Sequence, residues 1–294
     1  MLKNTHKFRH VFLCVLLSIS FLCSCARSSP RQAEDYERYT ASRRDEAPSS
    51  ESPSPDSPQA QRARMDFDAL CGKLFCDQLS ENYLTLHYTL ADPASYGITD
   101  CGLDFGNFSL ELLKEAGETQ KEDKASLDKI PVKFLTDQQQ LTYKILQATY
   151  EAEEKFEGLE LYYQPLAPTV GIQAQLPVLL AEYIFYSKQD VEDYLTLLSS
   201  IDRYYEQILE FEKEKAAAGL FMTDTCVDTI VSDCEAYLAA PEENFLASTF
   251  DERIDAMTDL QEAEKNTYKA RNLEVLTGHF IPAYETLLNG LKDL

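Results

Sequence analysis

Residues 224–238 read DTCVDTIVSDCEAYL, and this stretch decides the fold class. Its apolar residues recur every three or four positions, which places them on one face of an α-helix. The stripe consists of Val227, Ile230, Val231, Cys234, Tyr237 and Leu238. The acidic residues of the stretch fall outside the stripe, and a proline follows its end. The pattern predicts an amphipathic helix with one buried apolar face.

The same helical period continues over most of the chain from residue 66 onward. Further helices are predicted at 67–79, 105–117, 136–156, 189–199, 201–218, 250–260 and 262–293. Pro177 is expected in the first turn of another helix, where proline is tolerated. Residues 159–166 (LELYYQPL) are the candidate for one short strand or hairpin. The predicted fold class is therefore all-α, an array of many helices.

Local signals place several helix ends. Residues 136–139 (TDQQ) have the form of a capping box at a helix start. Gly117 and Gly219 are expected to end helices, because glycine readily adopts the left-handed conformation that follows a helix. Pro282 is expected to kink or divide the last helix, because proline lacks the backbone N–H.

The first 24 residues have the features of a secretory signal peptide. A basic start precedes VFLCVLLSISFLC (11–23), an apolar run too short to span a bilayer, which takes ~20 residues. Leu22-Cys23-Ser24-Cys25 resembles the bacterial lipobox. The resemblance implies cleavage before Cys25 and attachment of a diacylglyceryl group to its thiol. Two acyl chains suffice for stable membrane anchoring.

Three other interpretations of the N-terminal region compete with a lipobox. A plain signal peptide cut at another residue and an uncleaved anchor stay open. A metal site built on Cys23 and Cys25 lacks partners, because the next 40 residues contain no Cys or His. The favoured reading places the protein outside the cytoplasm, anchored to the membrane by lipid.

Residues 25–65 are predicted to be the lipidated Cys25 followed by a disordered tether. Residues 26–65 are rich in Ser, Pro and charged side chains and contain no Leu, Ile, Val or Phe. Such a segment cannot bury enough apolar surface to offset the entropy of ordering it. The folded domain is then expected at 66–294.

The domain is strongly acidic. The whole chain has 27 Lys and Arg against 50 Asp and Glu, and residues 66–294 hold 17 and 43 of these. Nucleic acid is excluded as a partner, because binding to phosphates requires positive charge. A solvated acidic surface that confers solubility is favoured over a specific site for cationic ligands.

The cysteines and histidines of the domain show no metal-site spacing. Five cysteines remain after Cys25, an odd number that allows at most two disulfides and leaves their pairing open: Cys71, Cys76, Cys101, Cys226 and Cys234. His87 and His279 stand alone, without an HExxH motif. No catalytic residue and no metal ligand is therefore predicted in this chain.

Several stretches resemble the N-terminal half of a bacterial family called domain of unknown function 885. They are ENYLTLHYTLADPASYGI (81–98), FLTDQQQLTYKIL (134–146), APTVGIQAQLPVLLAEYIFYSKQDVEDYLTLL (167–198) and HFIPAYETLLNGL (279–291). The third is the most specific, since it joins a Gly-x-Gln loop, a Leu-Pro helix start and the Asp-Val-Glu-Asp-Tyr-Leu helix in order. The similarity spans about residues 66–294.

The resemblance implies a largely helical protein similar to zinc metallopeptidases. Members of the family carry an HExxxGH-like motif in a C-terminal half that this chain lacks, so zinc is expected only there. The part present here would build one wall of a substrate groove. Tyr162, Tyr163, Gly171 and Gln173 are the candidates for that wall. A glycine required by a turn and tyrosines that pack a loop explain the same residues equally well.

Two functions follow from these observations. The first is the N-terminal portion of a metallopeptidase-like surface lipoprotein, inactive alone and completed by a complementary C-terminal fragment. The alternative is a non-catalytic helical lipoprotein that binds a peptide or a protein partner.

Overall fold

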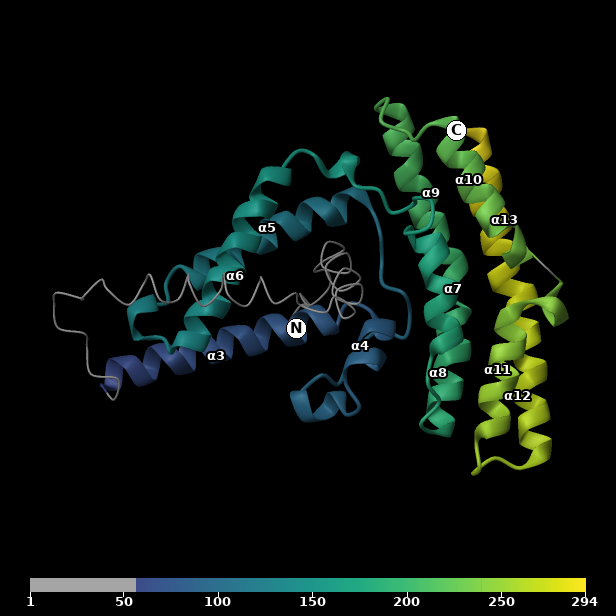
Figure 1. Cartoon of the computed structure of the whole chain (residues 1–294), viewed down its shortest axis with the longest axis horizontal. Helices are drawn as coiled ribbons and strands as arrows, with labels where there is room; N and C mark the ends of the chain where they lie inside the picture. Colours follow the sequence, from purple (N-terminus) through teal and green to yellow (C-terminus); the bar gives the residue numbers. More distant parts are fainter. Residues whose placement is uncertain (1–56, 239) are drawn as a thin grey trace, which may run out of the picture.

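The computed structural model describes residues 57–238 and 240–294, and all regular elements of these residues are helices, as predicted (Figure 1). The α-helices are α3 (Pro58–Leu79), α4 (Tyr83–Thr89), α5 (Leu110–Leu127), α6 (Asp137–Glu153), α7 (Ile172–Glu182), α8 (Lys188–Leu198), α9 (Ile201–Ala217), α10 (Asp224–Cys234), α11 (Phe245–Ala256), α12 (Glu262–Val275) and α13 (Ile281–Asp293). Short 3-10 turns are η2 (Pro93–Tyr96), η3 (Val132–Phe134), η4 (Glu154–Phe156), η5 (Glu160–Tyr162), η6 (Glu235–Leu238) and η7 (Pro241–Glu243), and η8 (Leu276–Phe280) is a π-helical turn. The predicted signal peptide, Cys25 and the first part of the tether lie outside the described residues.

The helices form two groups (Figure 1). The arm, made of α3, α5 and α6, has a small core of its own, which consists of Phe67, Leu127, Leu135, Tyr143 and Tyr150. The bundle, made of α7 to α13, has a larger core that also takes in the segment before α5. Within the bundle α13 packs along α9, and α12 packs along α11. The arm is thus a thin layer that extends away from a thicker body.

The helix that decided the fold class is confirmed. Ile230 and Cys234 of α10 are fully buried, and Val227 and Val231 beside them are buried in the same core. The last turn of the predicted helix tightens into η6. The helices α6, α8 and α9 also match their predicted ranges, and Thr136 and Gln139 form the predicted capping box.

The predicted tether is wrong in its last eight residues, because α3 begins at Pro58 rather than near residue 66. Ser57 caps the helix, and Ala60 and Ala63 are buried on the stripe that continues to Phe67. Arg64 donates a hydrogen bond from Nε to the Phe134 carbonyl at 2.9 Å. The prediction of disorder rested on the absence of Leu, Ile, Val and Phe. Buried alanines also contribute apolar surface, and here they form the start of the helix.

The predicted helix at 105–117 is displaced toward the C-terminus. Ser109 accepts a hydrogen bond from the Leu112 N–H at 3.1 Å and starts α5, which continues past Gly117 to Leu127. Phe105 and Phe108 precede the helix and are buried in the core of the bundle. Their spacing fits a helix, but the backbone there turns at Gly106, which has a φ of +81°.

Pro177 lies in the interior of α7 and not in its first turn. Because proline has no N–H, the carbonyl of Gln173, four residues earlier, lacks its usual helical donor. The hydroxyl of Tyr284 on α13 supplies one and donates to this carbonyl at 2.6 Å. The buried Tyr205 hydroxyl in turn donates to the Tyr284 oxygen at 2.8 Å.

Three further predictions are settled at the helix ends. The predicted helix at 250–260 starts earlier, because Asn244 caps α11 by accepting the Leu246 N–H at 3.0 Å. Pro282 does divide the last helix, and the π-helical turn η8 precedes it. Residues 159–166 form no strand, since residues 160–162 of that stretch are the 3-10 turn η5.

Candidate functional site

The arm contains a pocket of about 780 Å³, which we call the α5–α6 pocket. It lies between residues 111–121 of α5, the last turn of α6 and the segment 153–164. Its lining combines the rings of Tyr150, Phe156, Tyr162 and Tyr163 with seven glutamates and two lysines. This volume lies in the range of ligand sites, in which aromatic side chains commonly form part of the lining. Gly117 also lines it and leaves open space where another residue would place a side chain.

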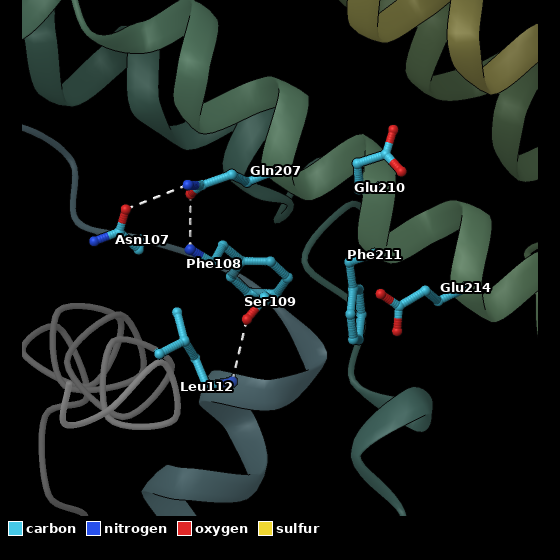
Figure 2. Close-up of a pocket in the computed structure, with 8 residues that line it drawn as sticks. All are labelled: Asn107, Phe108, Ser109, Leu112, Gln207, Glu210, Phe211 and Glu214. Atoms are coloured by element: carbon cyan, nitrogen blue, oxygen red, sulfur yellow. Dashed lines mark hydrogen bonds between the residues drawn. The ribbon is translucent and has the colours of Figure 1, made fainter.

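A glutamine of α9 holds the start of α5 in place (Figure 2). Gln207 accepts a hydrogen bond from the Phe108 N–H at 2.9 Å and donates to Asn107 Oδ1 at 3.2 Å. The Phe108 ring packs edge-on against Phe211 of α9, with 5.1 Å between the ring centroids. These contacts join the arm to the bundle beside a second, smaller cavity of about 390 Å³.

The segment 153–164 is held at both ends. Near its start, Lys121 of α5 donates to Glu157 at 2.9 Å and to Glu118 at 3.0 Å. At its end the Tyr163 ring packs on Phe108, with 5.9 Å between the ring centroids. Between these two points Leu159 and Tyr162 are 43% and 62% exposed, whereas Leu161 packs against the core of the bundle. The pocket therefore has an anchored wall that presents aromatic rings.

Glu153 is the most perturbed carboxyl group of this pocket. It is the last residue of α6 and half-buried, and desolvation raises its pKa from the ordinary 4.5 to about 7. None of the described residues forms an ion pair or a hydrogen bond with its carboxylate. A titratable group whose pKa is displaced in this way inside a pocket is a candidate for ligand binding.

The structure separates the four residues proposed for a groove wall. Tyr162 and Tyr163 line the α5–α6 pocket. Gly171 and Gln173 are buried at the start of α7 and do not line this pocket, so they are not part of its wall. The side chain of Gln173 donates to the Ala167 carbonyl at 2.7 Å, which closes the turn before the helix. For these two residues the requirement of a turn is the explanation that fits.

The two histidines of the domain lie apart and have structural partners. The His87 ring stacks on Tyr183 at 3.8 Å, its Nε2 lies 3.0 Å from the Ile184 carbonyl, and burial lowers its pKa. His279 Nδ1 lies 2.9 Å from Asp202. In the part of the chain that the structure describes, no three His, Cys, Asp or Glu side chains gather as a metal site. The five cysteines of the domain are free thiols.

Sequence reasoning did not find Glu153. It continues the stripe of Tyr143, Leu146 and Tyr150 along α6, so a carboxylate occupies a position that the helical period assigns to the core. A charged residue on an apolar stripe was the signal that could have found it. Lys121 and Glu157 gave no such signal, because they are brought together only by the tertiary fold.

Comparison with known proteins covers most of the chain. A crystal structure from Colwellia psychrerythraea, of a protein described as a lipoprotein, is similar with a TM-score of 0.63 and 16% sequence identity. The match covers 80% of this chain and 41% of that one, so this chain spans less than half of its length. No curated protein matches. At this identity the similarity establishes the fold alone.

Among the described residues, no helix has the length and apolar composition needed to cross a bilayer.

The model of one family, described as "Bacterial protein of unknown function (DUF885)", matches residues 95–294. This match runs from η2 to the end of the chain. It contains the stretches 134–146, 167–198 and 279–291 on which the resemblance was based, whereas 81–98 lies almost wholly before it. The chain therefore belongs to the DUF885 family of bacterial proteins.

Proposed function

We propose that the protein is a lipid-anchored extracytoplasmic lipoprotein that binds a peptide in the α5–α6 pocket. The observation that carries this proposal is a pocket of about 780 Å³ whose wall exposes Phe156, Leu159 and Tyr162. Large apolar side chains that gather in one exposed place mark a site of interaction. Aromatic rings supply much of the binding energy where proteins recognise peptides.

The lipid anchor rests on Leu22-Cys23-Ser24-Cys25 after a short apolar run. The description of the fold-similar Colwellia protein as a lipoprotein supports it. Labelled palmitate should enter the wild-type protein and be absent from Cys25→Ser, because the lipid is attached through a thioether that serine cannot form. Equal labelling of both proteins would contradict the anchor.

Peptide binding can be tested with a library of blocked pentapeptides dialysed against the full chain in a non-ionic detergent. Mass spectrometry of the retained peptides should reveal a subset that Tyr162→Ala binds at least about tenfold more weakly, the usual effect of losing an aromatic anchor. The matched control is Tyr186→Ala. Tyr186 is 71% exposed and does not line this pocket. Retention of no peptide, or equal retention by both variants, would contradict the proposal.

A second candidate is the N-terminal portion of a metallopeptidase-like protein, with zinc held by a complementary part. One surface favours it. The helix α7 is apolar on all sides, as is typical of a buried helix, yet it leaves Val178 and Leu179 exposed. Tyr88, Ile184 and Tyr186 beside them are exposed too. The match covers 41% of the Colwellia chain, so that protein contains a further part beyond the matched one.

The same dialysis experiment separates the two functions. A peptide that is retained intact supports a binding protein. Cleaved peptides that appear only when a complementary fragment and zinc are added would favour the peptidase portion. The chain alone is expected to cleave none, because no HExxH-type motif occurs in it.

A further inference from the structure

We propose that Glu153 makes the α5–α6 pocket selective for peptides with a lysine or arginine side chain, whose cationic group pairs with the Glu153 carboxylate. This inference rests on the proposed peptide-binding function and adds the chemical class of the ligand. It follows from the position of Glu153, from the charges around it and from the aromatic side chains that line the same pocket.

Two sources of negative charge favour a cation at the position of Glu153. It ends α6, and the dipole of a helix places partial negative charge at its C-terminus. The carboxylate adds a full negative charge at the same place. A cation bound there interacts with both, whereas an anion is repelled by both. The position therefore discriminates between ligands by the sign of their charge.

Neither lysine of the lining forms an ion pair with Glu153. From α5 the pocket receives Glu111, Lys114, Glu115, Glu118 and Lys121, and from the segment after α6 it receives Glu154, Glu157 and Glu160. Lys121 is already paired with Glu118 and Glu157. Lys114 forms no ion pair within 4.0 Å among the described residues. The remaining charges of the lining are carboxylates, so the pocket as a whole attracts cations.

The apolar part of such a ligand also finds a partner. Tyr162 and Tyr163 line the same pocket, and aromatic rings bind both methylene chains and cationic groups. A lysine or arginine side chain has a methylene stem and a charged end. Its stem can lie along the rings while its charged end reaches the end of α6. A small cation without a stem would use only half of this site.

Proton binding gives the pairing a pH dependence. Burial raises the pKa of Glu153 to about 7, so about one tenth of the free protein carries the carboxylate at pH 6. A cationic ligand binds the ionised form and must displace the proton. Binding should therefore be strongest near pH 8 and become about tenfold weaker at pH 6.

The test uses the full chain and three blocked pentapeptides with central lysine, norleucine or glutamate between two phenylalanines. Wild type should bind the lysine peptide about tenfold more tightly than the norleucine peptide, and the glutamate peptide weakest. Glu153→Gln should remove the preference for lysine and its pH dependence but leave the norleucine peptide within about twofold. The matched control is Glu151→Gln, which changes an exposed carboxylate of α6 outside the lining and should keep the preference.

The pH dependence of protein stability tests the environment of Glu153 without any ligand. Since the pKa of Glu153 is above its ordinary value in the folded state, the free energy of unfolding falls as pH rises from about 4.5 to 7. Glu153→Gln removes this loss, so its melting temperature should match wild type at pH 4 and be higher at pH 8.

The outcomes separate the inference from the function on which it rests. Equal binding of the lysine and norleucine peptides, or an equal loss in Glu153→Gln and Glu151→Gln, would overturn the selectivity and leave peptide binding intact. Failure of wild type to bind any of the three peptides would overturn both. An unchanged melting temperature of Glu153→Gln at pH 8 would show that the carboxylate is not desolvated, and the inference would fall.

Discussion

Ile230→Asp should lower the free energy of unfolding by about 3 kcal/mol or more, a large part of the about 5–15 kcal/mol that stabilises a typical domain. Ile230 is fully buried in the core of the bundle, between Val227 and Val231 of the same helix and the residues of α13. A carboxylate placed there would be desolvated without a partner, and the space of the isoleucine would be poorly filled. Urea denaturation followed by circular dichroism measures the change.

The control for this substitution lies one residue away. Thr229 is exposed on α10, so Thr229→Asp should change the free energy of unfolding by less than about 0.5 kcal/mol. If Ile230→Asp were as mild as Thr229→Asp, the stripe of α10 would face solvent and the packing of the bundle would be wrong.

Gly171→Ala should destabilise the protein by about 2–4 kcal/mol through overpacking, although its backbone conformation is open to any residue. A Cβ on Gly171 would lie 2.3 Å from the Ala167 nitrogen and 2.7 Å from the Ala167 oxygen. Both are backbone atoms, so the turn before α7 would have to shift. That turn places the Gln173 side chain on the Ala167 carbonyl, and the shift would disturb this hydrogen bond as well. Thermal denaturation of the variant gives the loss.

Gly117→Ala is the matched control for this glycine. A Cβ on Gly117 meets no atom within 4 Å, and the residue lies inside α5. Alanine is favoured over glycine in a helix by up to about 1 kcal/mol, so this variant should be slightly more stable than wild type. If Gly171→Ala lost no more stability than the experimental error of the measurement on Gly117→Ala, the turn before α7 would accommodate a Cβ without cost.

Periodicity predicted the helices of this protein well where local and tertiary requirements agree. In α10 the stripe, the flanking proline and the buried face all coincide. In α6 the capping box marked the start within one residue. Neither case needed knowledge of distant parts of the chain.

Periodicity failed where an apolar residue is buried by a distant partner. Phe105 and Phe108 have helical spacing, but they reach the core from a loop that Gln207 of α9 holds in place. The start of α3 was missed for the opposite reason, because buried alanines carry little apolar signal. Helix ends depend on contacts with distant residues, and a short stretch of sequence gives no information on these contacts.

Of the four residues proposed from the sequence for a groove wall, two line the α5–α6 pocket. Tyr162 and Tyr163 drew attention as adjacent aromatic residues in an irregular segment, and they do line the pocket. Gly171 and Gln173 belonged to the same stretch of resemblance but serve the turn before α7. Glu153 derives its character from desolvation, and the burial that causes it exists only once α5, α6 and the segment 153–164 are assembled.

The hydrogen bond from Tyr284 to the Gln173 carbonyl has a consequence for the order of folding. The two residues are 111 positions apart, so the donor leaves the ribosome long after α7 has been synthesised. Until then the carbonyl opposite Pro177 can only be satisfied by water, and α7 cannot bury this part of its surface without loss. Contacts of such large sequence separation slow folding, because a long loop must close before they form. The core of the bundle is therefore completed late, when nearly all of its helices have been synthesised.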